Sequence, residues 1–296
     1  MIDFSILRSP ISRSELTQKK PGEFFDLANH LVAKFNEEEQ RFEWIQHNNY
    51  PKLDNALLRE IQKYDKWADE QVLNLAAREE TSQFNIDQED IYQKNPNFRQ
   101  LDFNLSQLVE HQSVLDIGGS CIDSWRFLLA GAKNVHQVEV SCGSQRLGMA
   151  RLKSKLPERD SQLDNFLFHT SPAEYLPFAD SCFDLVFSRS SLHHTDRSLS
   201  IDEIGRVLKK GGYLLLFEPL QTKLNNLIMH AARKFRNVDR GTDDPLTCQD
   251  LYQLKNKFTE VRVSPKRVLD YDAKKTAAWL LRRDSKPAIP VILARK

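Results

Sequence analysis

The chain has 296 residues and a formal net charge of +1, with 42 lysines and arginines against 41 aspartates and glutamates. This balance gives no electrostatic reason to expect a nucleic-acid partner, which usually requires a basic surface. The length accommodates one large α/β domain with an appendage. We recognise no signal peptide or long apolar segment, and the four cysteines lack the C-x-x-C spacing of zinc ligands. We therefore expect a cytoplasmic protein with free thiols, no metal and no membrane span.

Residues 1–60 do not share the pattern of the remaining chain, and we expect an N-terminal appendage there, formed by a hairpin and a helix. From residue 57 to about 80, apolar side chains recur at intervals of three and four, which predicts an amphipathic helix. The segment 81–104 is polar and rich in Asn and Gln, as in a movable flap or a substrate-facing loop. We assign residues 61–296 to the main domain.

The most informative segment begins at residue 113. Residues 113–117 read as an apolar strand that contains Asp116, and the pair Gly118–Gly119 follows it. After a predicted helix, a second strand at 135–140 places Glu139 23 positions beyond Asp116, close to the roughly 20 residues expected in a nucleoside-binding βαβ unit. In such a unit the glycines let main chain approach the ligand, and the second acid accepts the ribose hydroxyls.

The loop after the first strand reads Gly118-Gly119-Ser120-Cys121-Ile122, so it keeps only the front of the G-x-G-x-x-G pattern that binds a pyrophosphate. It resembles instead the first motif of the class I S-adenosylmethionine-dependent methyltransferases, which reads acid-x-Gly-x-Gly-x-Gly. Asp116 and Gly118 match that motif, whereas Ser120 and Ile122 replace its second and third glycines. A β-branched residue resists the positive φ that glycine adopts readily.

Two later segments strengthen the resemblance, because they occur in order and at the family's spacing. Residues 173–187 read AEYLPFADSCFDLVF, which is similar to the family's third loop and fourth strand. Residues 203–219 read EIGRVLKKGGYLLLFEP, which resembles the signature over the next helix and the fifth strand. The predicted elements are a strand at 183–188, a helix over 201–209 that is opened by a Ser200–Glu203 capping box and ended by Gly211–Gly212, and strands at 213–217, 259–263 and 289–294.

The resemblance implies a doubly wound, Rossmann-like α/β fold with a seven-stranded sheet whose last strand is antiparallel, and S-adenosyl-L-methionine as the cofactor. In such relatives the first motif holds the methionine end, the second strand's acid holds the ribose, and the third loop borders the adenine. The resemblance therefore assigns to the cofactor Asp116, Gly118, Gly119, Ser120, Glu139, Val140, Ser171, Ala173, Ser188 and Tyr64. Pro172 stands where relatives commonly carry an acid, and proline offers no side-chain hydrogen bond.

The resemblance also predicts a function for two further segments. Tyr64-Asp65-Lys66-Trp67-Ala68 is similar to the "FD-x-x-A" segment that lies over the cofactor in many relatives, so 61–104 is expected to be a lid; amphipathic packing is the alternative for Tyr64 and Trp67. The insertion 221–253 occupies the place that usually carries substrate specificity. Its predicted helix has a basic tail, which either meets an anionic substrate or a carrier protein or is a solvated helix end.

The segment 188–194, Ser-Arg-Ser-Ser-Leu-His-His, follows the fourth strand and should border the reaction centre. Transfer of a methyl group from a sulfonium requires an aligned nucleophile and, for an oxygen acceptor, a base, for which histidine is suited. His193 and His194 are the candidates, with a preference for His194; the alternative is that one histidine packs behind the strand. Asp196 could orient a histidine, and Arg189 could contact substrate or neutralise Glu218.

The resemblance implies an enzyme that methylates oxygen, nitrogen or carbon of a small or carrier-bound metabolite. Neither the Asn-Pro-Pro-Tyr run of amino-group methylases nor the Pro-Cys pair of cytosine-C5 methylases is present. Two alternatives stay open: a catalytically silent methyltransferase-like binding or scaffold protein, favoured by Ser120, Ile122 and Pro172, and an RNA methyltransferase. The appendage also faintly resembles a zinc-ribbon-like module associated with some methyltransferases, in which Ser9 and Ser12 replace two cysteines. Such a module would have lost its metal.

Overall fold

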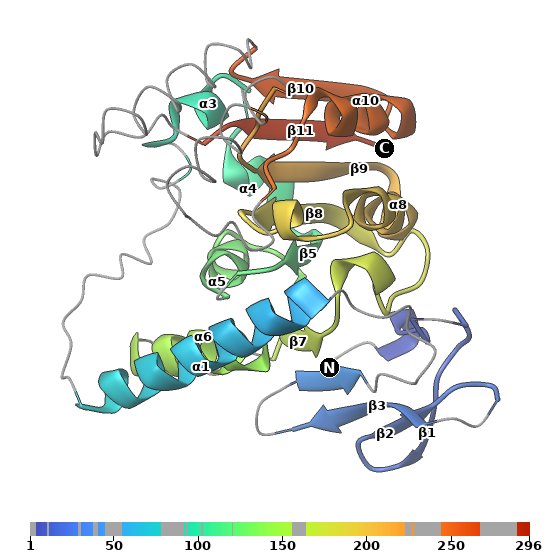
Figure 1. Ribbon diagram of the computed structural model, residues 1–296. Helices are drawn as coiled ribbons and strands as arrows, with labels where there is room; N and C mark the ends of the chain where they lie inside the picture. The colour runs from blue at the N-terminus through green and yellow to red at the C-terminus, as the bar shows by residue number, and fades with distance from the viewer. Residues whose placement is uncertain are drawn as a thin grey trace.

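In the computed structural model, the strands of the described residues form one sheet in the order β1-β2-β3-β4-β7-β6-β5-β8-β9-β11-β10. Figure 1 shows these strands stacked from β10 at the top to β1 at the bottom. The structure describes residues 4–10, 12–28, 31–37, 41–44, 55–77, 92, 94–101, 103–119, 121–155, 164–222, 227, 244–266 and 289–296. The strands are β1 Thr17–Lys20, β2 Glu23–Phe25, β3 Leu31–Asn36, β4 Arg41–Trp44, β5 Ser113–Ile117, β6 Asn134–Glu139, β7 Phe166–Thr170, β8 Phe183–Arg189, β9 Leu208–Phe217, β10 Glu260–Ser264 and β11 Val291–Arg295.

The centre of the sheet is parallel, and β11 runs antiparallel to both β9 and β10. Helices cover both faces, which confirms the predicted doubly wound α/β class. They are α1 Asn55–Ala77, α3 Pro96–Arg99, α4 Leu105–Val109, α5 Ile122–Leu129, α6 Cys142–Lys155, α8 Arg197–Val207 and α10 Cys248–Lys257. Single turns of 3-10 helix lie at η1 Phe4–Ile6, η2 Ala173–Tyr175 and η3 Leu192–His194.

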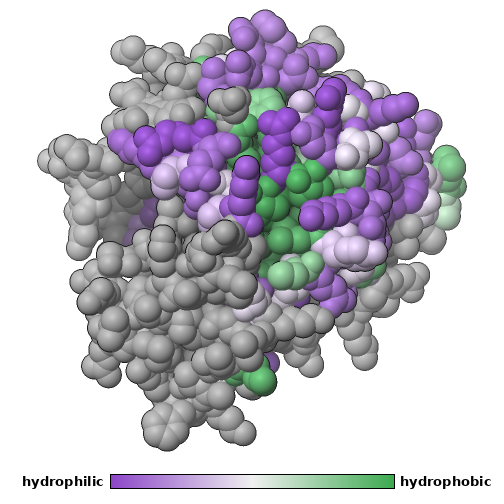
Figure 2. Space-filling view, turned by 90° about the horizontal axis from the view of Figure 1, so that it is seen from above, coloured by the Kyte–Doolittle hydropathy of each residue, from purple (hydrophilic) through white to green (hydrophobic). Residues whose placement is uncertain are grey.

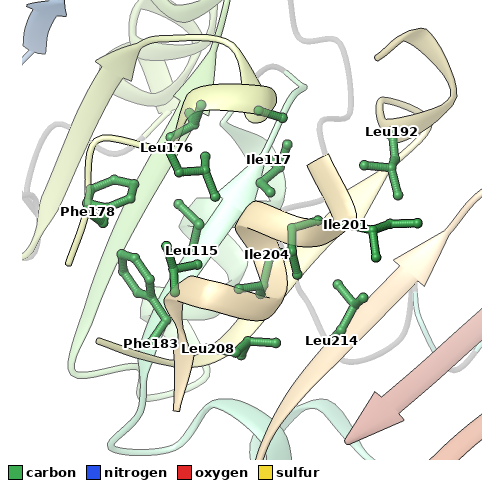
Figure 3. Close-up of a cluster of buried hydrophobic side chains, with 14 of the residues drawn as sticks. Leu115, Ile117, Leu176, Phe178, Phe183, Leu192, Ile201, Ile204, Leu208 and Leu214 are labelled. Carbon is green, nitrogen blue, oxygen red and sulfur yellow. The ribbon is translucent and has the colours of Figure 1, made fainter. Parts of the chain in front are cut away.

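Two apolar clusters hold these layers together, one on each face of the sheet. On one face, Leu115 of β5 and Leu214 of β9 pack against Ile201 and Ile204 of α8, all fully buried (Figure 3). On the other face, a second cluster joins the sheet to α3, α4 and α5, with Trp125 of α5 among its largest side chains. Burial on both faces explains why the central strands read as continuous apolar runs.

The number of strands differs from the sequence prediction. Seven were predicted, but the described residues contribute eleven strands to the sheet, because β1–β4 join its edge through parallel pairing of β4 with β7. Phe42 of β4 is completely buried and stacks on His169 of β7. A strand that carries two aromatic side chains, as β4 does, is stabilised by a sheet edge that offers unpaired main-chain groups. Leu7 and Trp44 are also buried in the core.

A buried chain of three rings crosses β4, β7 and β6. Trp44 Nε1 donates to His169 Nδ1 over 3.3 Å, and the other nitrogen of His169 lies 3.0 Å from Nδ1 of His136. Because an indole nitrogen only donates, His169 must accept at Nδ1 and donate from Nε2, which fixes its neutral tautomer. Burial, and then the neighbouring His136, lower the pKa of His169 well below its ordinary value.

The segment after β8 begins its helix earlier than predicted. Asp196, not Ser200, caps α8 by accepting from Leu199 N, and Ser200 is buried with its hydroxyl on Thr195 Oγ1. The helix also ends at Val207 rather than at residue 209. Gly211 and Gly212 lie within β9 instead of ending the helix.

The strand extends toward α8 because its first residues pair with β8. Leu208 pairs with Phe183, and Lys209 Nζ forms an ion pair with Asp184 at 2.8 Å. A side chain at Gly212 would meet the carbonyl oxygen of Asp184 at 2.9 Å, so glycine is required by close approach of main chain.

The outer edge of the sheet at β10 carries charged side chains. Glu260 and Arg262 of β10 pair with each other at 2.6 Å at this edge. Seen from above, this end of the molecule has an apolar area framed by hydrophilic side chains (Figure 2). Charges on an edge strand discourage pairing with another chain.

Candidate functional site

A cavity of about 310 Å³ lies at the carboxyl ends of the central parallel strands, where open α/β sheets bind ligands. Its walls come from the loops after β5, β6, β7 and β8 and from α1. Seven predicted cofactor residues line it: Tyr64, Gly118, Gly119, Glu139, Val140, Ser171 and Ala173. Ser120, which stands in place of the second glycine of the first motif, lies outside the described residues.

The turn after β5 depends on its two glycines for different reasons. Both have positive φ, +81° at Gly118 and +83° at Gly119. A Cβ on Gly118 would lie 1.9 Å from the hydroxyl oxygen of Ser191, so the loop after β8 leaves no room for a side chain there. A Cβ on Gly119 would meet nothing within 4 Å, so its main chain is open toward the cavity. The turn therefore presents bare backbone to a ligand.

Asp116 does not line this cavity but a smaller chamber of about 110 Å³ beside it, which shares Gly118, Gly119 and Arg189 with the larger one. The Asp116 carboxylate accepts from the Ser124 hydroxyl at 2.5 Å. Burial, followed by the nearby Asp123 carboxylate, raises the pKa of Asp116 well above its ordinary value. Ile122 also lines the chamber, and it is absent from the walls of the larger cavity.

Glu139 ends β6 at the cavity wall, the place at which the sequence predicted a ribose-binding acid. One carboxylate oxygen accepts from Ser141 N at 2.9 Å. Burial raises the pKa of Glu139 to about 7, against the lowering effect of main-chain donors that include Ser141. Near neutral pH this carboxyl group therefore exchanges between its ionised and its protonated form.

The loop after β7 supplies another part of the cavity wall. Ser171 is buried and donates to the carbonyl oxygen of Tyr175, while Ala173 and Glu174 also face the cavity. Pro172 precedes the turn η2 in an extended conformation and does not line the cavity. Burial raises the pKa of Glu174, whose carboxylate accepts from the Asp196 N–H at 2.8 Å.

Helix α1 forms a wall over the cavity with Ile61, Tyr64 and Trp67. Tyr64 and Trp67 are 39% and 43% exposed, so they lie at its mouth rather than in the core. Between them, Asp65 accepts from Ser141 Oγ at 2.7 Å and from Gly143 N at 2.9 Å, at the start of α6.

Gly143 accounts for the closeness of the two helices. A side chain there would lie 2.8 Å from Cα of Asp65. Figure 1 shows α1 and α6 running side by side. Ser141 therefore connects the α1 wall to the acid that ends β6, because its N–H donates to Glu139 and its hydroxyl donates to Asp65.

The two adjacent histidines after β8 have different surroundings. His194 lines the cavity. His193 is buried, with Nδ1 2.6 Å from Oε2 of Glu218, and Oε1 of that carboxylate accepts from the main-chain N–H groups of Ser191 and Leu192. Glu218 is completely buried.

The structure does not bring Ser188 to the cavity. This predicted cofactor residue is fully buried, and its hydroxyl donates to Glu218 at 3.0 Å. Asp196 does not orient a histidine, because its carboxylate caps α8. Side chains alternate between the two faces of a strand, which places position 188 on the side of β8 away from the ligand.

Arg189 does not neutralise Glu218. Its guanidinium forms an ion pair with Asp123 of α5 at 2.6 Å. The same carboxylate accepts from Arg126 at 3.0 Å and from the hydroxyl of Tyr92 at 2.6 Å. No pattern in the sequence indicates this cluster, because its members come from three separate segments: residue 92, helix α5 and the end of β8.

Comparison with known proteins gives a consistent picture. Residues 115–216 match the family model of the methyltransferase domain. The "Ubiquinone/menaquinone biosynthesis C-methyltransferase UbiE" of Acidiphilium cryptum is 34% identical over 115 residues, which cover 38% of this chain and 44% of that protein. The "Sarcosine/dimethylglycine N-methyltransferase" of Aphanothece halophytica is 30% identical over 110 residues, covering 37% of this chain and 38% of that protein.

The chain thus spans less than half the length of these curated relatives. Among solved structures, the YcgJ protein of Bacillus subtilis aligns with a TM-score of 0.48 and 18% identity, covering 64% of this chain and 94% of that one. No helix in the described ranges is both long and apolar enough to cross a membrane. The described His, Cys, Asp and Glu residues form no group of three or more that could hold a metal ion.

Proposed function

We propose that this chain is an S-adenosylmethionine-dependent methyltransferase acting on a small or carrier-bound metabolite. One observation carries the proposal: a single cavity joins the open main chain of Gly119, the carboxylate of Glu139 and the loop of Ser171 and Ala173. These are the parts that a nucleoside with an amino-acid tail requires, namely bare backbone, an acceptor for ribose hydroxyls and a loop beside the base. The cavity volume also falls in the range of ligand pockets.

When bound, the cofactor supplies a methyl group on a positively charged sulfur. The residues of this chain would align the acceptor, limit the entry of water and remove a proton. Tyr64 and Trp67 of α1 would cover the site from one side. His194 is the histidine with access to the cavity and would take the acceptor's proton, whereas His193 is held by Glu218 behind the loop.

The acceptor is proposed to carry a flat or apolar part, because Ile61, Tyr64 and Trp67 make one wall of the cavity apolar. The names of the relatives point to quinone precursors and to small amines as acceptors of those enzymes. For this chain the apolar wall favours carbon or oxygen of a ring system over the nitrogen of a hydrophilic amine.

Calorimetric titration of the full chain with S-adenosylhomocysteine tests the proposal. We expect a micromolar dissociation constant that rises at least tenfold in Glu139→Ala, while Glu110→Ala, which removes an exposed carboxylate, leaves it unchanged. Transfer of a labelled methyl group from S-adenosylmethionine to a panel of quinols, phenols and amines then identifies the acceptor class. An absence of binding would indicate a catalytically silent scaffold. Methylation of RNA, with steep salt dependence of its binding, would indicate the second alternative.

A further inference from the structure

The first residues of the chain pair with the loop after β7, which forms part of the cavity wall. Residues 5–10 and 12–14 are called the N-terminal strap below. Leu7 of the strap forms an antiparallel bridge with Phe178 of the loop, and both side chains are buried. Main-chain hydrogen bonds flank this bridge, from Ala179 N to Ile6 O at 2.7 Å and from Arg8 N to Pro177 O at 3.1 Å. The strap is therefore fixed to the loop along its backbone.

The strap ends in a tight turn that carries Arg13. Ser9 N donates to the carbonyl oxygen of Ser14 at 3.0 Å, and Arg13 N donates to the carbonyl oxygen of Ser9 at 2.9 Å. Ser9 is buried, and its hydroxyl oxygen accepts from Ser12 N at 3.3 Å. Arg13 has a φ of +59°, in the left-handed region that residues with a side chain adopt only at a cost. Ser9 and Ser12 thus belong to a turn that fixes the position of a strained arginine.

The side chain of Arg13 reaches the loop at Leu176, two residues beyond Glu174 of the cavity wall. Its Nη1 donates to the carbonyl oxygen of Leu176 at 3.0 Å, and its Nη2 forms an ion pair with Glu203 of α8 at 2.7 Å. Glu203 is buried, and its other carboxylate oxygen accepts from Leu176 N at 3.0 Å. One planar guanidinium thus binds Leu176 and, at the same time, the carboxylate that holds the N–H of Leu176.

A second arginine holds the same loop from the opposite end of the chain. Arg206 of α8 donates to the carbonyl oxygens of Leu176 at 3.0 Å and of Phe178 at 2.6 Å. Arg206 lies within residues 115–216, the segment that matches the family model, whereas Arg13 lies outside it. The loop is therefore held once by the core and once more by the N-terminal strap. Loss of the strap contact should loosen the loop without releasing it.

Resting on the proposed function, we infer that Arg13 is a positioning residue that holds the loop after β7 in the conformation that binds the cofactor. Ala173 and Glu174 face the cavity from the same loop, so a shift of Leu176 moves this part of the wall. A loosened loop must be ordered when a ligand binds, and that ordering lowers the affinity. The N-terminal strap is accordingly part of the site, although none of its described residues lines the cavity.

Amide hydrogen exchange of the full chain, without ligand, tests the hold on the loop. We expect Arg13→Gln to accelerate exchange about threefold or more in a peptide that covers residues 172–180, and to leave a peptide over β5 unchanged. Arg13→Lys keeps the charge but not the planar fork, so it should fall between the wild type and Arg13→Gln. Arg8→Gln is the matched control, because that guanidinium contacts residues of the same N-terminal segment, and it should change neither peptide.

Calorimetric titration with S-adenosylhomocysteine measures the consequence for the site, at a temperature at which every variant is folded. We expect the dissociation constant to rise about threefold to tenfold in Arg13→Gln, the effect of one lost hydrogen bond. It should recover in part in Arg13→Lys and stay unchanged in Arg8→Gln. Faster exchange in the loop together with weaker binding supports the inference.

Three results would overturn the inference. Unchanged exchange in Arg13→Gln shows that the strap does not hold the loop, and faster exchange with an unchanged dissociation constant shows that the hold does not serve the site. Faster exchange in every peptide shows a general loss of stability. If the wild type binds no S-adenosylhomocysteine, the proposed function fails, whereas the exchange of residues 172–180 still decides whether Arg13 holds the loop.

Discussion

The two sides of the loop after β8 differ in burial and in hydrogen bonding. Beneath it, Glu218 is completely buried and accepts from Ser188, His193 and two main-chain N–H groups. Above it, His194 faces a cavity bounded partly by exposed aromatic side chains. The buried side is suited to holding the loop in place, and the cavity side is suited to contact with a ligand. Two histidines that are adjacent in one motif are thus expected to serve different purposes.

The difference suggests how substitutions in this motif should be interpreted. Buried polar groups that satisfy one another contribute to stability mainly through the penalty for leaving one unpaired. Groups that face a cavity contribute little to stability and can be dedicated to ligand or catalysis. Stability and turnover should therefore separate on the two sides of the loop.

The largest effect should come from the buried side. Glu218→Ala leaves four donors without their acceptor and should lower the free energy of unfolding by about 3–5 kcal/mol, because each buried donor left unsatisfied costs about 1 kcal/mol or more. Chemical denaturation measures this. Glu218→Gln retains an acceptor and should be milder, and the exposed Glu110→Ala should stay within about 0.5 kcal/mol of the wild type. Equal stability of Glu218→Ala and the wild type would contradict the role of this carboxylate in holding the loop in place.

The second effect concerns catalysis on the cavity side. His194→Ala should reduce kcat about 100-fold or more, the usual contribution of a general base, without changing the melting temperature or the dissociation constant of S-adenosylhomocysteine. His193→Ala should show the reverse, a lower melting temperature and a kcat within a few-fold of the wild type per folded molecule. If both variants keep full turnover, proton removal is assigned to another group or is not needed by the acceptor.

The third effect is a pH dependence set by Glu139, whose pKa is raised to about 7 by burial. If Glu139 binds the ribose as proposed, its ionised carboxylate accepts the two hydroxyls, so affinity for S-adenosylhomocysteine should increase as the pH rises. The gain should be at most tenfold per pH unit below pH 7 and should level off above it. Titrations between pH 5.5 and 8.5 check this. Glu139→Gln should bind more weakly with a flat profile, and a profile of unchanged slope in that variant would assign the pH dependence to another group.

The smallest effect tests the attachment of α1 to α6. Asp65→Ala removes the acceptor for Ser141 and Gly143 and should weaken S-adenosylhomocysteine binding about fivefold, equivalent to about 1 kcal/mol, the usual magnitude of a lost helix cap. Asp69→Ala removes an exposed acid from the same helix and serves as the control. An equal change in both variants would indicate a general effect of charge on α1 rather than a specific contact at the site.

The predicted ranges of β5, β6, β8, β10 and β11 agree with the structure within two residues, because buried apolar runs end at acids and glycines, as at Asp116 and Glu139. In contrast, β9 begins at Leu208 rather than at residue 213, and β7 was not predicted. Contacts between segments that are distant in the sequence could not be predicted. The carboxylate of Asp65 accepts from the N–H of Gly143, which lies 78 positions later in the chain. No local sequence pattern predicts a contact of this kind. The capping box at Ser200 was a false signal, since Asp196 provides the cap. Position 188 was misassigned because a motif does not reveal which face of a strand a side chain occupies.

The attachment of the N-terminal strands has a consequence for how the chain acquires its structure. Trp44 in β4 and His169 in β7 are 125 positions apart. During synthesis β1–β4 therefore emerge long before β7, the strand with which β4 pairs. Until β7 is available, the apolar residues of β1–β4 lack their packing partners in the core. Contacts of such wide sequence separation form slowly because a long loop must close first. The docking of β1–β4 is consequently expected to be a late event in folding, following assembly of the parallel core.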